Sequence, residues 1–258
     1  MLHRLFAGLA VFFAGTTLAH ATLINTSQLQ DQLDARTRDG EFQNVNEDQA
    51  APDELWTLAS INNGTAMIMF ELAGNAGSNS MGIYDPYNTS NTLELFAGLD
   101  GSATKIGLIE NDGLVGTCAW SGWGCTFTGN AISLTGGTFG FYLDVPEIGS
   151  RFYSQSALNT DAAADGTTDH LVAFAGDGSD DIDPLLTGDY GIFAPGEYII
   201  AWEDLRLSDG DRNYSDMVVL MESIVPVPEP GPLALLGAAL VALGLVRIKA
   251  SRRVAAIA

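Results

Sequence analysis

The sequence predicts an all-β protein, a jelly-roll-like β-sandwich with one short N-terminal helix. Short apolar runs alternate with clusters of Gly, Asn, Asp and Ser along most of the 258 residues, a pattern typical of strands and turns. Residues 139–145 alternate between apolar side chains and Gly140, Tyr142 and Asp144, as a strand with one buried face requires. Helical patterns between the strands are missing, which excludes a parallel α/β sheet.

The first element is a predicted signal peptide over residues 1–21. His3 and Arg4 precede an apolar stretch from Leu5 to Leu18, and Ala19-His20-Ala21 supplies small residues for cleavage. We therefore expect signal peptidase to cut after Ala21 and the body, residues 22–225, to be exported.

The body begins with a short helix, for which Ser27 is the expected N-cap. Leu29 and Leu33 share one face of this helix, which is expected to end near Gly40. Roughly nine or ten strands should follow. Met217 to Met221 is apolar throughout, as expected for a strand covered on both faces. The predicted strands are Leu55–Ile61, Thr65–Leu72, Met81–Tyr84, Thr92–Phe96, Lys105–Ile109, Thr138–Val145, His170–Ala175, Glu197–Trp202 and Met217–Ile224.

Cys118 and Cys125 flank a six-residue loop and should form a disulfide in an oxidising compartment. A bridge over so short a loop stabilises by about 2–3 kcal/mol when unstrained. The loop also contains Trp120 and Trp123. These indoles could be exposed platforms for sugar rings or for another protein, or they could pack over the end of the sandwich.

The body is strongly acidic, because the two targeting segments hold five of the 11 basic residues but only one of the 32 acidic ones. Such a charge excludes nucleic acid as a partner and disfavours anionic lipid. Calcium ions among the carboxylates would relieve the repulsion. A solvated acidic surface that keeps the protein soluble is the equal alternative.

The richest polar cluster lies between the last two predicted strands. Carboxylate and amide oxygens at this density favour Ca²⁺. An ion-paired turn in which Arg212 bridges the carboxylates is the alternative. The segment is not an EF-hand, because Tyr214 replaces the turn glycine. The predicted calcium ligands are Glu203, Asp204, Asp209, Asp211, Asn213 and Asp216.

Catalysis has little support in the sequence. His170 is the only histidine of the body, and its place at the start of an apolar strand favours a structural hydrogen bond over proton transfer. The sequence has no Gly-x-Ser-x-Gly elbow. Paired loop carboxylates could still serve a glycoside hydrolase.

The C-terminal segment, residues 226–258, combines prolines, an apolar run and positive charges. The prolines keep the chain extended. Gly231 to Val246 gives sixteen uncharged residues, slightly short of the roughly 20 that span a bilayer. This membrane helix is followed by a basic cluster that should hold the C-terminus on the cytoplasmic side, formed by Arg247, Lys249, Arg252 and Arg253.

The motif Pro228-Glu229-Pro230, followed by a membrane helix and a basic tail, resembles the PEP-CTERM sorting signal of Gram-negative bacteria. The resemblance implies recognition by an exosortase-type membrane enzyme, which cuts near this motif and passes the protein to the cell envelope, outer surface or extracellular matrix. The helix would then be a transient anchor. An ordinary C-terminal anchor with a proline-rich hinge is the alternative.

The body resembles exported PEP-CTERM proteins that carry domain-of-unknown-function family 4114, most closely over residues 139–225. In that family the acidic loop usually has Asp and Asn where this chain has Asn213 and Ser215. Both replacements still offer oxygen. The family has no assigned activity, so the resemblance implies a surface role and a possible calcium site. The similar segments are Phe70–Ala76, Met81–Asp85, Phe152–Ser154, Asp169–Phe174 and Trp202–Leu205 through Met221–Ser223.

Together these features predict a non-enzymatic, calcium-stabilised protein of the cell surface that acts in adhesion or in exopolysaccharide and biofilm association. A secreted glycan hydrolase that uses loop carboxylates, or a glycan-binding module that uses Trp120 and Trp123, are the alternatives.

Overall fold

The computed structural model describes residues 22–59, 63–111, 113–121 and 124–228. The predicted signal peptide, the membrane helix 231–246 and most of the sorting signal, including Glu229, Pro230 and the basic cluster, lie outside these ranges and stay predictions. Pro228 is described and exposed. Within the described ranges, no helix is both long and apolar enough to cross a membrane.

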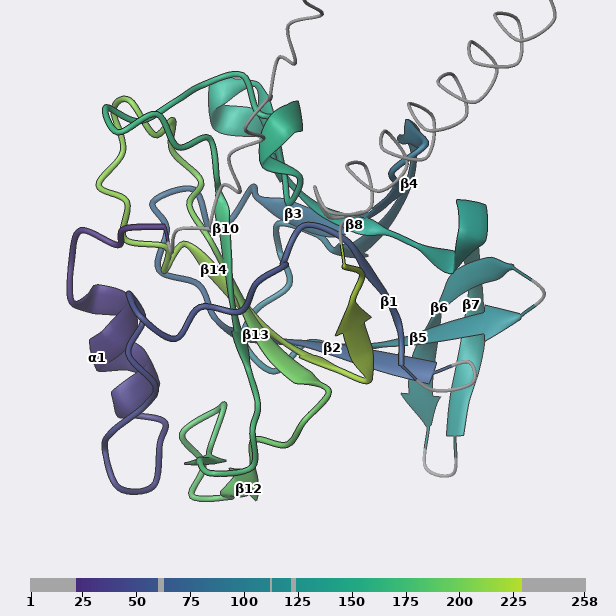
Figure 1. The fold of residues 1–258 in the computed structure, drawn as a ribbon. Helices are drawn as coiled ribbons and strands as arrows, with labels where there is room; N and C mark the ends of the chain where they lie inside the picture. Colours follow the sequence, from purple (N-terminus) through teal and green to yellow (C-terminus); the bar gives the residue numbers. More distant parts are fainter. Residues whose placement is uncertain (1–21, 60–62, 112, 122–123, 229–258) are drawn as a thin grey trace, which may run out of the picture. The chain divides into compact units, whose positions relative to one another are not determined.

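The described body is all-β, with one α-helix, α1 (Gln28–Asp34), and fifteen strands that pair antiparallel throughout (Figure 1). The large sheet has the order β10 (Leu171–Ala175), β13 (Glu197–Trp202), β14 (Met217–Glu222), β2 (Asn63–Phe70), β5 (Lys105–Asn111), β6 (Leu114–Ser121) and β7 (Gly124–Ser133). The small sheet has the order β4 (Asn88–Phe96), β3 (Ser80–Asp85), β8 (Gly140–Val145) and β9 (Ser150–Tyr153).

Two further strand pairs are short. They are β1 (Trp56–Leu58) with β15 (Ile224–Pro226), and β11 (Asp181–Ile182) with β12 (Gly191–Ile192). The predicted all-β sandwich is therefore confirmed at the level of class and layers. A division into seven and four strands departs from the eight strands of a regular jelly roll, because the hairpins β5–β6–β7 extend one sheet.

The main core fills the space between the two sheets. It includes Ile68 of β2, Ile83 of β3, Phe141 of β8 and Val219 of β14, none of which is exposed. Apolar burial of this kind contributes about 25 cal/mol per Å² and is the main force that holds the layers together.

A second core covers the outer face of the large sheet at β10, β13 and β14. Leu29 and Leu33 of α1 pack there with Val218 and Leu220 of β14, and Figure 1 shows α1 beside these strands. Met217, Val219 and Met221 point into the main core instead. The prediction that this strand is covered on both faces is confirmed.

The predicted alternation in residues 139–145 holds for the main core, which contains Phe139, Phe141, Leu143 and Val145. Tyr142 is also buried, although the pattern places it on the outer face. The guanidinium of Arg151 lies 4.2 Å above its ring. A charged side chain from the next strand therefore covers an aromatic ring that the sequence pattern assigns to solvent.

The predicted helix is correct in place but too long. It ends at Asp34 rather than near Gly40, because Arg36 and Thr37 donate their N–H groups to the carbonyls three residues back, which closes turns. Ser27 occupies the N-cap position without a side-chain cap to the backbone; its hydroxyl donates to Asp31 at 2.8 Å.

The cysteine segment lies in a hairpin of two long strands, β6 and β7. Cys118 is buried in β6. In the register of the hairpin, Trp120 stands opposite Cys125, and Cys118 opposite Phe127. The side chains of Trp120 and Cys125, and the whole of Trp123, lie outside the described part. The disulfide and the aromatic platform stay predictions.

Candidate metal centre and its surroundings

Three carboxylates meet where β13 ends and β14 begins. Trp202, the last residue of β13, pairs with Met217, the first of β14, so Glu203 and Asp204 emerge beside Asp216. One oxygen from each carboxylate lies within 4.8 Å of the other two. All three residues are buried, with Glu203 fully inaccessible. We call Glu203, Asp204 and Asp216 the acidic centre.

A second segment, residues 71–79 between β2 and β3, reaches the same point. Phe70, the last residue of β2, pairs with Val218 of β14. Glu71, the next residue, therefore lies at the same end of the strands as the acidic centre. Asn79 and Asn75 donate side-chain N–H bonds to Asp204 Oδ2 at 2.8 and 3.2 Å. The sequence analysis missed this segment, since only the strand order brings it here.

Two buried oxygens of this segment have no hydrogen-bond partner among the described residues. They are Oδ1 of the fully buried Asn79 and Oε1 of Glu71. The Asn79 amide donates to Asp204, which leaves its oxygen free to accept. Buried acceptors are normally satisfied by a donor or a cation. Both residues interact with Asp204, since Asn79 donates to it and its charge raises the pKa of Glu71.

The carboxyl groups are held where their charged forms are unfavourable. Burial, and then the charges of Glu203 and Asp204, raise the pKa of Asp216 well above its usual range. Burial and the charge of Asp211 raise the pKa of Glu203. Burial and Asp204 raise the pKa of Glu71 to about 8. Either a proton or a cation must compensate these groups.

The loop itself is shaped by backbone donors. The N–H groups of Leu205 and Asn213 donate to the two oxygens of Glu203 at 3.2 and 3.0 Å, and the N–H of Asp204 donates to Asp216 at 2.8 Å. Arg212 and Tyr214 adopt left-handed backbone conformations with φ of 53° and 52°. Such φ values are uncommon outside glycine, and they turn the loop back toward the acidic centre.

The six predicted ligands do not all belong to the acidic centre. Glu203, Asp204 and Asp216 form the acidic centre, and Asp211 lies close enough to raise the pKa of two of them. The Asn213 side chain is engaged within the loop: its amide donates to Asp211 at 2.8 Å, and its oxygen accepts from the Ser215 hydroxyl at 2.8 Å. Asp209 is exposed, outside the acidic centre.

The alternative of an ion-paired turn does not describe this loop. Arg212 forms its ion pair with Asp165, at 2.8 Å, and not with the acidic centre. Among the described residues, no Lys, Arg or His side chain forms an ion pair with Glu203, Asp204 or Asp216. The compensating positive charge for these carboxylates is therefore not supplied by a side chain of the described chain.

His170 lies directly behind the acidic centre and is fully buried. Its ring stacks on Phe152 at 3.6 Å between centroids. Nδ1 faces the Glu203 carbonyl oxygen at 3.0 Å, and Nε2 faces both oxygens of Asp161 at 3.1 Å. Burial lowers the pKa of His170, against the effect of Asp161. The contacts fit the predicted structural hydrogen bond, with Asp161 as a partner that the sequence did not reveal.

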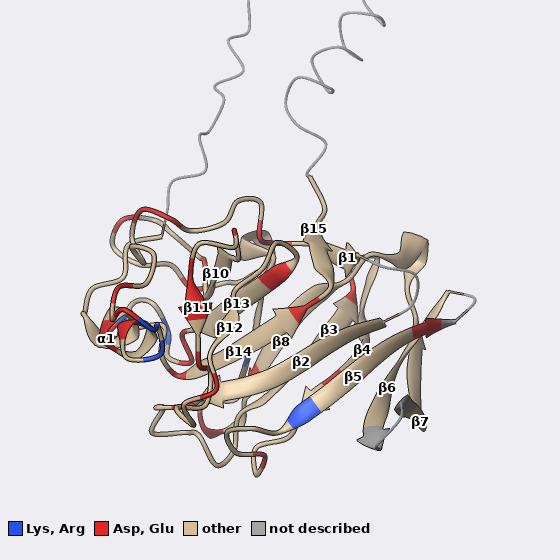
Figure 2. Ribbon diagram, turned by 90° about the horizontal axis from the view of Figure 1, so that it is seen from below, with Lys and Arg blue, Asp and Glu red and all other residues tan. Residues whose placement is uncertain are grey.

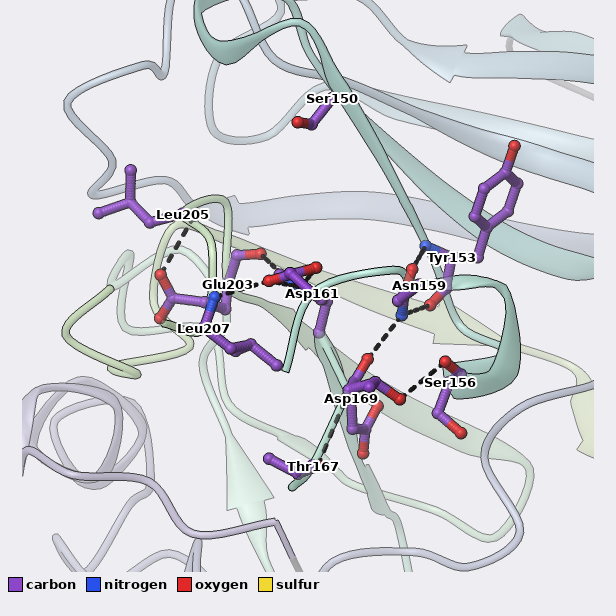
Figure 3. A network of polar contacts seen from close by, with 12 residues as sticks. Ser150, Tyr153, Ser156, Asn159, Asp161, Thr167, Asp169, Glu203, Leu205 and Leu207 are labelled. Atoms are coloured by element: carbon purple, nitrogen blue, oxygen red, sulfur yellow. Dashed lines mark hydrogen bonds and ion pairs between the residues drawn. The ribbon is translucent and has the colours of Figure 1, made fainter. Parts of the chain in front are cut away.

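Asp161 connects this histidine to the rest of the network. Figure 3 shows it between Leu207, whose N–H donates to it at 2.8 Å, and the strand that ends at Tyr153. Asn159 ties that strand to the following segment, since its amide donates to the carbonyls of Tyr153 and Thr168 at 3.0 and 2.8 Å. These bonds hold residues 153–170 against the loop of the acidic centre.

Comparisons with known proteins add nothing to this geometry: no family model, curated protein or solved structure matches the chain. The resemblances to PEP-CTERM proteins and to domain-of-unknown-function family 4114 therefore stay predictions.

Proposed function

We propose that this chain is an exported, non-enzymatic β-sandwich of the cell envelope or extracellular matrix, stabilised by a calcium ion at the acidic centre. The observation that carries the proposal is the buried group of Glu203, Asp204 and Asp216, for which the described chain offers no positive partner. A cation bound there would compensate the charges that burial makes unfavourable.

The chemistry of the donors favours calcium over other metals. Every candidate ligand of the centre offers oxygen, and neither Cys nor His belongs to the group, which disfavours zinc. Ca²⁺ accepts six to eight oxygen ligands in flexible geometry, whereas Mg²⁺ demands near-ideal octahedral geometry and keeps several waters. Three buried carboxylates, with Asp211, Glu71 and Asn79 close enough to interact with them, suit the larger ion.

The first experiment compares thermal melting of the purified protein in calcium, in magnesium and in chelator. Calcium alone should raise the melting temperature markedly, because an ion that binds only the folded state stabilises it. Asp216→Asn should lose most of that increase. In chelator the same variant should melt at a higher temperature than the wild type, since Asn is neutral without the proton that the buried carboxyl must take up, and it has nearly the same size.

Asp209→Asn is the matched control, because Asp209 belongs to the same loop but is exposed and outside the acidic centre. It should respond to calcium as the wild type does. Equal responses of the two variants, or a wild type insensitive to calcium, would refute the metal centre and return these carboxylates to a metal-free role.

The surface role rests on the targeting signals and on the charge of the body. Acidic residues occur on β3, β4, β5, β8, β11, β13 and β14 and on many of the loops, and basic ones are few (Figure 2). Signal peptidase and an exosortase-type enzyme are the proposed processing partners, with a transient membrane stage and exopolysaccharide as a later partner. Fractionation of Gram-negative cells should find the protein outside the cytoplasm, and deletion of Pro228 to Pro230 should leave it in the membrane fraction.

The rival function, a glycan hydrolase, needs carboxylates that reach a substrate. The acidic centre is at most 5% exposed, and its oxygens already accept backbone N–H bonds. These observations favour structural coordination over acid–base catalysis.

A further inference from the structure

A polar pocket of about 380 Å³ opens beside strand β9, and no residue of the acidic centre lines it. It is lined by residues 149–153 of the small-sheet edge, by Leu158, Thr160 and Asp161, and by Arg206 from the β13–β14 loop. Figure 3 shows Ser150, Tyr153 and Asp161 around this region. Its volume falls within the range of small-molecule sites and is many times the roughly 30 Å³ share of one water. It can therefore hold more than a simple ion.

Two of the few positive charges of the body line this one pocket. The described chain has six Lys and Arg residues, of which Arg38, Arg151 and Arg212 form ion pairs with carboxylates, and Arg36 lies buried near Asp183. Arg206 is exposed and has no hydrogen bond or ion pair from its guanidinium among the described residues. It therefore offers a full set of donors to a ligand.

Arg151 supplies a second, more rigid cation at the same pocket. Its Nε and Nη2 donate to the two oxygens of Asp144, both at 2.6 Å, and its guanidinium stacks on the ring of Tyr142. This bidentate bond fixes the plane of the group and leaves its Nη1 edge for other acceptors.

Asp161 also lines the pocket. Both of its oxygens lie 3.1 Å from His170 Nε2, and Oδ2 accepts the N–H of Leu207 at 2.8 Å. Its carboxyl group, with a side chain 14% exposed, remains able to bond a hydroxyl group of a ligand.

We propose that this pocket binds a carboxylated sugar of the uronic-acid type. Arg206 binds the carboxylate, and Arg151, Asp161 and the hydroxyls of Ser150 and Thr160 bond the ring hydroxyls. An anionic ligand suits the unpaired guanidinium, and a polyhydroxylated ring suits the size and the polar lining of the pocket. The inference deepens the proposed surface role by naming the glycan class, and it does not require the calcium ion.

The test is calorimetric titration of the purified full chain with D-glucuronate, D-glucose and acetate, in calcium-containing buffer. Glucuronate should bind in the millimolar range or tighter. Glucose and acetate should bind about tenfold more weakly or not at all, because glucose lacks the carboxylate and acetate lacks the ring hydroxyls. Arg206→Ala should lower the affinity for glucuronate about tenfold. It should leave melting unchanged, since the side chain is exposed and unpaired.

Lys105→Ala is the matched control: it removes the other exposed basic residue that has no ion pair among the described residues, and this residue belongs to β5 rather than to the pocket. The variant should bind glucuronate as the wild type does. Equal binding of acetate would show a simple anion site, and equal loss in both variants a general charge effect. Either result, or no binding of glucuronate, overturns the inference. Melting in calcium and chelator tests the metal centre separately.

Discussion

Glu71, Glu203 and Asp216 make the metal-free protein sensitive to pH through their raised pKa values. A carboxyl whose pKa is higher in the folded than in the unfolded state binds more protons when folded, so stability falls as pH rises. For Glu71 this window runs from its ordinary value of 4.5 to about 8. In chelator, the free energy of unfolding should therefore decrease from pH 5 to pH 8.

Urea denaturation at several pH values measures this effect. Calcium should remove the decrease or reverse it, because the ion binds the ionised carboxylates and competes with protons. A metal-free protein that becomes more stable over this range would contradict the burial of these groups.

Tyr214 is the residue that fastens the acidic loop to the second core. It is fully buried, and its hydroxyl donates to the Asp169 carbonyl at 2.6 Å. Tyr214→Phe leaves that carbonyl without its partner and should cost about 1–2 kcal/mol of unfolding free energy. Tyr87→Phe, at a residue 78% exposed, should change it by less than about 0.5 kcal/mol. Denaturant titration of the two variants compares these values, and equal costs would be inconsistent with this contact.

Residue identity alone predicted part of the candidate site. Glu203, Asp204 and Asp216 lie between two strands that the apolar pattern predicts. The high density of carboxylates between these strands is visible in the sequence. Asp209 belongs to the same run, but the loop turns its position outward to solvent. Arg212 and Tyr214 adopt a left-handed backbone conformation that the sequence usually indicates by a glycine. Because neither residue is a glycine, the path of the loop could not be predicted.

At the scale of elements, α1 stabilises the protein by covering the outer face of the large sheet. Leu29 and Leu33 are its buried residues, and they contact a sheet whose other face already packs in the main core. Leu29→Ala and Leu33→Ala should each cost about 2–5 kcal/mol. Thermal and denaturant unfolding measure the loss.

Gln28→Ala is the control within the same helix, since Gln28 is exposed. It should be neutral or slightly stabilising, because Ala has the higher helix propensity. Leucine variants as stable as this control would indicate that α1 does not contribute to the folded state.

The strands were predictable where they have apolar patterns and not where they lack them. Each predicted strand overlaps an observed one, and these are β1, β2, β3, β4, β5, β8, β10, β13 and β14. β7 (Gly124–Ser133) was missed because Gly, Thr and Asn dominate it; it forms because it completes a hairpin with β6. Pairing with a neighbour supplies the hydrogen bonds that local propensity does not indicate.

At the scale of the whole molecule, the formal net charge of −21 should oppose folding when calcium is absent. Sodium chloride shortens the Debye length from about 30 Å at 0.01 M to about 8 Å at 0.15 M, which weakens this repulsion. The melting temperature in chelator should therefore rise by a few degrees with salt, where each kcal/mol corresponds to about 2–4 °C.

The comparison that matters is between salt and calcium. Sodium chloride of equal ionic strength should not reproduce the calcium effect, because screening acts on the whole surface and coordination acts at one site. If sodium chloride matched calcium, general screening would explain the stabilisation.

The sequence by itself determined the fold class, the short helix and the position of the acidic loop, because alternation, turn residues and charge density are local properties. Tertiary structure decided the rest. Antiparallel register brought Glu71 and Asn79 to the carboxylates of a loop more than a hundred residues away, paired His170 with Asp161, and set Arg206 beside β9. Such contacts join distant segments, and the strand order that creates them depends on the packing of two cores rather than on any local pattern.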